Sequence, residues 1–121
     1  MNKKRILVVD DEAGFTRLLK MVLPLYEIRE ENDPINALAA AREFNPDLIL
    51  LDFIMPELDG GTLAAKFRED PMFRFTPIVF LTAIVSAQEA SVRKTIDGFP
   101  CLAKPVTKEK LVECINQNLP G

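Results

Sequence analysis

The sequence has no histidine and no tryptophan among its 121 residues. Without histidine, a Ser-His-Asp triad, a histidine zinc site and a phosphohistidine carrier are all excluded. There are only two cysteines, Cys101 and Cys114, and their spacing is not that of a metal site. We expect both to be reduced thiols in or near the core. Any chemistry must therefore use carboxylates, a lysine and hydroxyl groups.

Long apolar runs and an excess of basic charge are absent as well. No run approaches the length of a membrane span, and residues 1–5 lead into only four aliphatic residues, too few for a signal peptide. The net charge is −3, with Lys and Arg spread along the chain, which argues against direct nucleic-acid binding. We expect a cytoplasmic protein without membrane contact, folded as one domain over residues 1–121.

Apolar segments that end in a polar residue are the main positive signal. Residues 48–51 are four large aliphatics between Asn45-Pro46 and Pro56, which is typical of a strand buried on both faces of a parallel sheet. Residues 6–9, 78–81 and 101–103 form similar runs. Ligands bind at the carboxyl ends of parallel strands, so the polar endings should share one pocket. These endings are Asp10-Asp11, Asp52, Thr82 and Lys104.

Helical patterns alternate with these strands. Phe15, Leu18, Leu19 and Val22 recur at helical spacing and predict core packing, whereas residues 26–30 alternate as an edge strand does. Strand and helix alternate five times, which predicts an α/β fold with a doubly wound parallel sheet flanked by five helices. Asp59 is interpreted as a turn residue and residues 70–77 as a loop. The expected helices cover residues 15–22, 33–44, 63–67, 86–97 and 107–115.

The predicted pocket favours phosphoryl chemistry. Carboxylates brought within a few ångströms of one another repel, and each pKa rises unless a cation compensates. Oxygen ligands favour Mg²⁺ or Mn²⁺ over zinc, and Mg²⁺ commonly binds phosphate oxygens as well. Asp52 can then be a nucleophile that forms an aspartyl phosphate. Asp10 can equally cap the following helix, and Lys104 can be a solvated side chain, but their coincidence at strand ends favours a functional site.

The sequence contains four short motifs whose order and spacing resemble those of the receiver domain of two-component response regulators, over essentially the whole chain. They are Val8-Val9-Asp10-Asp11-Glu12, Leu51-Asp52 with Met55-Pro56-Glu57-Leu58-Asp59-Gly60, Thr82-Ala83 and Lys104-Pro105. The resemblance implies a flavodoxin-like fold with five parallel strands in the order 2-1-3-4-5. It also implies a signalling domain, which is not an enzyme beyond its own phosphorylation and slow autodephosphorylation. Its partner would be a sensor histidine kinase or a phosphotransfer protein.

The resemblance also implies roles for individual residues. Asp52 would accept the phosphoryl group, and Thr82 and Lys104 would bind phosphoryl oxygens. The Lys104-Pro105 peptide would be cis. Mg²⁺ (or Mn²⁺) would be bound by Asp10, largely through water, and directly by Asp11, Asp52 and the backbone carbonyl of Ile54.

The chain departs from the family pattern at two positions. Cys101 stands where receivers usually carry the Tyr or Phe whose rotamer reports phosphorylation, so we expect Thr82 to report it through residues 83–86 instead. Phe99 shares the strand face of Cys101 by parity. Cys114 replaces the arginine that is common in receivers that dimerise through their fourth and fifth helices. This departure argues against dimerisation in that mode, while a weak homodimer stays open.

Two alternatives of other classes were compared with the receiver. A haloacid-dehalogenase-like phosphatase also forms an aspartyl phosphate, but it needs a second acid two residues beyond the nucleophile, where Ile54 stands. A flavodoxin-like FMN-binding protein needs hydroxyls and open amides after the first strand, where Asp10-Asp11-Glu12 would repel phosphate. Because the sequence ends at residues 119–121 without an effector domain, we expect a single-domain regulator or a phosphorelay shuttle, although an excised receiver would look identical.

Overall fold

A parallel sheet forms the centre of the computed structural model, which describes residues 3–55, 58–83, 95–96 and 98–119. Within these residues the strand order is β2-β1-β3-β4-β6-β5. All neighbours from β2 to β6 pair in parallel, and only β5 pairs antiparallel with β6. The predicted order 2-1-3-4-5 is confirmed, with β6 as the fifth parallel strand. The strands are β1 (Arg5–Val9), β2 (Glu27–Glu31), β3 (Leu48–Asp52), β4 (Ile78–Thr82), β5 (Thr95–Ile96) and β6 (Phe99–Ala103).

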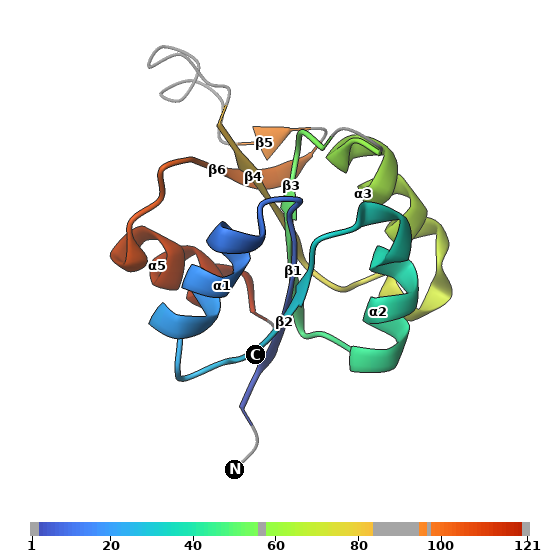
Figure 1. Ribbon diagram of the computed structural model, residues 1–121. Helices are drawn as coiled ribbons and strands as arrows, with labels where there is room; N and C mark the ends of the chain where they lie inside the picture. Colours follow the sequence, from blue (N-terminus) through green and yellow to red (C-terminus); the bar gives the residue numbers. More distant parts are fainter. Residues whose placement is uncertain (1–2, 56–57, 84–94, 97, 120–121) are drawn as a thin grey trace.

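Helices cover both faces of the sheet, as Figure 1 shows, with α1 and α5 on one face and α2 and α3 on the other. Each pair of helices packs on the side chains that the strands direct to its face, because successive strand residues point to opposite sides. Leu7, Ile49 and Phe80 belong to the α2–α3 side, and their neighbours Val8 and Leu50 to the α1–α5 side. The helices are α1 (Ala13–Val22), α2 (Ala37–Phe44), α3 (Gly60–Glu69) and α5 (Lys108–Asn118), with single 3₁₀ turns at Pro34–Asn36 and Pro71–Phe73.

The sequence patterns of the strands agree with their positions. Every residue of β3 and β4 is buried, as expected for central strands with helices on both faces. β2 pairs only with β1 and keeps its charged residues partly exposed, which confirms the predicted edge strand. Both cysteines are reduced, as predicted, with Cys114 buried and Cys101 half-buried. None of the helices in the described part of the chain has the length and apolar character needed to cross a bilayer.

Side-chain caps begin several of the helices. Asp33 and Thr107 cap Pro34–Asn36 and α5 as predicted, each accepting a hydrogen bond from a backbone amide. Asp59 is more than the predicted turn residue, because its carboxylate accepts from the amide of Thr62 and caps α3. The predicted loop over residues 70–77 begins with the 3₁₀ turn Pro71–Phe73. The side chain of Phe73 is fully buried, which anchors this turn to the core.

Two further expectations are corrected. Leu18 was predicted in the core, but it is 53% exposed because it lies on the outer side of α1, and Thr16 is buried instead. The fourth helix was predicted over residues 86–97, most of which lie outside the described residues. Its predicted end is wrong, because β-branched Thr95 and Ile96 form β5 and pair with Pro100 and Phe99.

Candidate functional site

The carboxyl ends of four strands meet at one edge of the sheet. Val9 of β1 lies beside Leu51 of β3, and Thr82 of β4 lies beside Ala103 of β6. This register places the residues that end or follow these strands next to one another. The structure thereby brings together the sequence-predicted residues, which are Asp10, Asp11, Asp52, Thr82 and Lys104.

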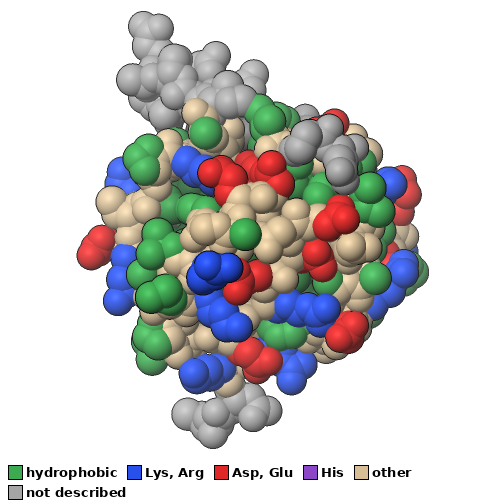
Figure 2. Space-filling model, viewed as in Figure 1, with side chains coloured by type: hydrophobic (Ala, Val, Ile, Leu, Met, Phe, Trp, Pro, Cys, Tyr) green, Lys and Arg blue, Asp and Glu red, His purple; other side chains and the backbone are tan. Residues whose placement is uncertain are grey.

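Three carboxylates form a compact acidic cluster at this edge. One carboxylate oxygen from each of Asp10, Asp11 and Asp52 lies within 4.8 Å of the others. Asp10 and Asp52 are buried, with 0% and 5% exposure, while Asp11 is exposed. Figure 2 shows acidic side chains gathered beside a basic one near this end of the molecule. The cluster can therefore be reached from solvent on the side of Asp11.

The ammonium group of Lys104 lies inside the same cluster. Its Nζ is 2.6 Å from Oδ2 of Asp10, 3.5 Å from Oε1 of Glu12 and 3.9 Å from Oδ1 of Asp52. Burial disfavours the charged ammonium, but the hydrogen bond and charge of Asp10, with the charges of Asp52 and Glu12, outweigh it and raise the pKa of Lys104. The lysine is thus a fixed positive charge beside the acids.

The carboxyl of Asp52 is held in an unfavourable environment for ionisation. Burial and the neighbouring charge of Asp10 raise its pKa to about 6, although Lys104 and the amide of Ile54 partly offset them. Ile54 donates that hydrogen bond to Oδ1 of Asp52 at 3.3 Å. A carboxyl poised in this way gains from any cation that joins the cluster.

Backbone hydrogen bonds fix the loops that carry these groups. The amide of Glu12 donates to Oδ1 of Asp10 at 2.9 Å, and Asn32 donates from its side chain to the Asp10 carbonyl at 2.8 Å. The amide of Lys104 donates to the carbonyl of Thr82 at 2.7 Å. Thr82 is buried, with 3% exposure, at the end of β4. The Lys104-Pro105 peptide is cis, as the resemblance implied.

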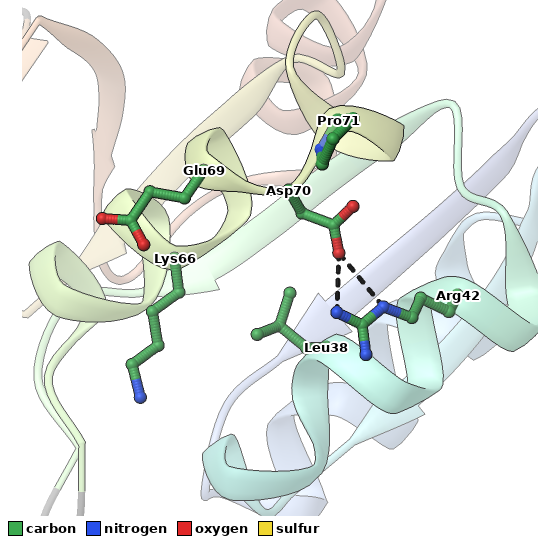
Figure 3. A pocket seen from close by; sticks show the side chains of 6 residues that line it. All are labelled: Leu38, Arg42, Lys66, Glu69, Asp70 and Pro71. Carbon is green, nitrogen blue, oxygen red and sulfur yellow. Dashed lines mark hydrogen bonds and ion pairs between the residues drawn. The ribbon is translucent and has the colours of Figure 1, made fainter.

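The described residues contain another hollow, an open groove of about 560 Å³ between α2 and α3 (Figure 3). Nε and Nη2 of Arg42 both donate to Oδ2 of Asp70 across it, at 3.0 and 2.8 Å. No member of the acidic cluster lines this groove. It is lined by Leu38, Arg42, Lys66, Glu69, Asp70 and Pro71.

The donor set of the acidic cluster fits a hard divalent cation. Among the described residues it offers carboxylate oxygens only, and two of the three carboxylates are buried. Mg²⁺ and Mn²⁺ prefer such oxygens, and their charge would offset the burial and the repulsion from Asp10 that raise the pKa of Asp52. The predicted ion and the observed residues are therefore compatible.

Sequence reasoning missed the neighbours that surround Lys104. Glu12 lies within a quoted motif, yet only the structure shows its carboxylate near the ammonium. Phe15 was assigned to the core by its helical spacing, but its ring also faces Lys104 at 4.3 Å. Asn32 follows β2 and showed no signal of its own, because its role depends on the pairing of β2 with β1.

Comparison with known proteins supports one family. The family model described as "Response regulator receiver domain" matches residues 6–116. The chain is 45% identical over 82 residues to the response regulator PleD of Caulobacter vibrioides, covering 66% of this chain and 18% of PleD. It is 39% identical over 118 residues to the transcriptional regulatory protein ResD of Bacillus subtilis, covering 92% of this chain and 46% of ResD. The chain thus spans less than half the length of these curated relatives.

Solved structures give the same answer. The chemotaxis protein CheY4 of Vibrio cholerae superposes with a TM-score of 0.83 at 28% identity, with 97% of this chain and 99% of that chain covered. A response regulator from Chloroflexus aurantiacus superposes with a TM-score of 0.82 at 28% identity, with 96% and 97% covered. Neither the phosphatase nor the flavodoxin alternative is supported. The chain belongs to the response regulator receiver domain family.

Proposed function

We propose that Asp52 is the phosphoacceptor of this receiver domain and that it takes the group from a phosphohistidine of a sensor kinase or phosphotransfer protein. The observation that carries the proposal is the placement of Asp52 at the end of the central strand β3. Its carboxylate lies 3.9 Å from Lys104 and within 4.8 Å of the carboxylates of Asp10 and Asp11. A buried carboxylate, an acidic cluster that fits a cation and an ammonium thus lie together, which supports the proposal.

The acidic cluster is the proposed magnesium site. Asp11 and Asp52 would bind Mg²⁺ (or Mn²⁺) directly together with the carbonyl of Ile54, and Asp10 would act largely through water. When bound, the ion supplies positive charge that neutralises the acids and the incoming phosphoryl oxygens. Exposure of Asp11 leaves an entry path from solvent.

The transfer itself needs little from the protein beyond position and charge. An oxygen of Asp52 forms a bond to phosphorus while the bond from phosphorus to the donor nitrogen breaks, and the donor imidazole takes a proton from solvent. Thr82 ends β4 and Lys104 follows β6, and from these positions both side chains can donate to phosphoryl oxygens. The cost of dehydrating the Asp52 carboxylate is already included in folding, because Asp52 is buried.

The domain would act as a signalling element whose only reactions are its own phosphorylation and its slow autodephosphorylation. Thr82 would report the phosphoryl group to residues 83–86, as the small thiol of Cys101 cannot replace the usual aromatic side chain. The single domain over residues 1–121, the cytoplasmic location and the weak homodimer stay predictions of the sequence.

Phosphorylation by a small-molecule donor tests the assignment. Incubation with acetyl phosphate and Mg²⁺ should add the mass of one phosphoryl group to the intact protein, and Asp52→Asn should abolish the addition. Asp59→Asn is the matched control, because Asp59 is an exposed acid and asparagine also caps helices. Undiminished labelling of Asp52→Asn would refute the proposal.

A further inference from the structure

The aromatic ring of Phe15, in α1, contacts the ammonium group of Lys104. Nζ of Lys104 lies 4.3 Å from the centroid of the Phe15 ring, well inside the range of a cation–π contact. Phe15 is half-buried and packs against the apolar cluster between the sheet and helices α1 and α5. The ring is therefore held in place by apolar packing, and its face contacts the ammonium.

The carboxylate neighbours of the ammonium can lose their hold on it, either to a bound cation or to solvent. Asp10 and Asp52, at 2.6 and 3.9 Å from Nζ, belong to the acidic cluster that also fits a divalent cation. Glu12 lies 3.5 Å away, but its side chain is 69% exposed, so solvent weakens its attraction. Phe15 differs from these carboxylates because its ring is not a ligand for a divalent cation and is half-buried.

We propose that Phe15 is a positioning residue that keeps the ammonium of Lys104 at the site when Asp10 and Asp52 turn to a bound cation. This role in phosphoryl transfer rests on the proposed function of Asp52. A lysine with four rotatable bonds would otherwise move out into solvent once its buried carboxylate partners are neutralised. The aromatic face attracts the charge without competing for a metal ligand or a phosphoryl oxygen.

Nuclear magnetic resonance can test the contact without any phosphorylation. Protons of the Lys104 ε-methylene group over a ring face should resonate upfield of the other lysines, and they should stay upfield when Mg²⁺ is added. Phe15→Leu keeps an apolar side chain in the core but removes the ring, so the upfield shift should vanish. Phe44→Leu is the control, because the Phe44 ring lies under Arg5, at 5.8 Å, and not under Lys104.

Kinetics then test the role in transfer. Partly exposed cation–π contacts are weak, so Phe15→Leu should slow phosphorylation by acetyl phosphate by about two- to tenfold. Phe15→Tyr keeps the ring and should restore both the rate and the upfield shift. The affinity for Mg²⁺, followed by the amide signals of Asp10 and Asp11, should change less than the rate in either variant. Phe15→Met serves as a second ring-free variant if the leucine protein does not fold.

The outcomes separate this inference from the proposed function. An upfield shift that survives Phe15→Leu, or one that wild-type protein loses when Mg²⁺ binds, would overturn it. Equal phosphorylation rates for wild type and Phe15→Leu would overturn it as well. If wild-type protein takes no phosphoryl group at all, the function of Asp52 is refuted, and the resonance of Lys104 with and without Mg²⁺ still decides whether Phe15 holds the ammonium.

Discussion

The ammonium of Lys104 lies 2.6 Å from a carboxylate oxygen of Asp10, although 94 positions separate the two residues in the chain. The contact exists because β1 and β6, which precede these residues, end at the same edge of the parallel sheet. Asp10 is fully buried, so its charge needs a partner, and Lys104 provides it. The unphosphorylated domain thus balances part of its acidic cluster with an internal cation.

The first prediction concerns the exposed acid of the cluster. Asp11→Ala removes a proposed Mg²⁺ ligand, so the rise in melting temperature that Mg²⁺ causes in wild type should shrink. It also removes one carboxylate from a repelling group, which should stabilise the metal-free protein. Thermal melts with and without Mg²⁺ measure both effects. Glu109→Ala, which removes an exposed acid of α5, is the control. An unchanged Mg²⁺ effect in Asp11→Ala would show that Asp11 is not a ligand.

The second prediction follows from the raised pKa of Asp52, about 6 against an ordinary value of 3.8. Below pH 4 the carboxyl is protonated in both the folded and the unfolded chain, so it costs the fold nothing. Between pH 4 and 6 the unfolded chain ionises first, so stability falls as the pH rises, by roughly 2–3 kcal/mol in total. Above pH 6 the loss is complete.

Urea unfolding in the presence of a chelator checks this pH dependence. Asp52→Asn cannot ionise, so its stability relative to wild type should grow from pH 4 to pH 6 and then stay constant. Groups distant from Asp52 titrate in the same way in both proteins, so their contributions cancel in the difference. A difference that does not vary with pH would mean that the pKa of Asp52 is not raised.

The strand ends could be predicted from the sequence because a parallel sheet leaves little choice. Once residues 48–51 are identified as a doubly buried strand, Asp52 must stand at its carboxyl end, beside the ends of its neighbours. The contacts between side chains could not be predicted in the same way. The distance from Phe15 to Lys104 depends on where α1 packs across the sheet, and β5 depends on a hairpin through Gly98, whose φ of 84° favours glycine.

The third prediction uses two glycines in opposite surroundings. A Cβ atom on Gly60 would lie 2.6 Å from the carbonyl oxygen of Asp52 and 2.7 Å from Cα of Phe53, so backbone must move. Gly60→Ala should therefore destabilise the fold by about 1–3 kcal/mol and displace the backbone of Asp52, the proposed phosphoacceptor. Gly14, in the first turn of α1, has nothing within 4 Å of such an atom, so Gly14→Ala should be neutral or stabilising by up to about 1 kcal/mol.

Urea unfolding and acetyl phosphate labelling of the two alanine variants check this contrast. The close contact at Gly60 involves the backbone of Asp52, the proposed phosphoacceptor. Labelling of Gly60→Ala should therefore be slower than that of Gly14→Ala even at temperatures where both are folded. Equal stability and equal labelling of the two variants would contradict the predicted contact.

The last prediction concerns the lifetime of the aspartyl phosphate. Hydrolysis requires a water molecule in line with phosphorus, and the resemblance to receivers places the residues two beyond Asp52 and two beyond Thr82, Ile54 and Ile84, beside its approach. Ile54 is 49% exposed, so its side chain lies at the surface near Asp52, the proposed phosphoacceptor. Ile84 lies outside the described residues. Neither isoleucine can accept a hydrogen bond from water and orient it, so we expect slow loss of the phosphoryl group.

Polar replacements at these positions should shorten the lifetime. Ile54→Asn with Ile84→Glu supplies groups that can orient the water, and the decay should accelerate by roughly tenfold or more. The decay is measured after acetyl phosphate has been removed, by the mass of the intact protein. Ile35→Asn is the control, because Ile35 is likewise exposed but lies outside the phosphoacceptor loop. If wild type decays as fast as the double variant, water reaches phosphorus without help from either side chain, and lifetime must be set by Lys104 and the bound ion instead.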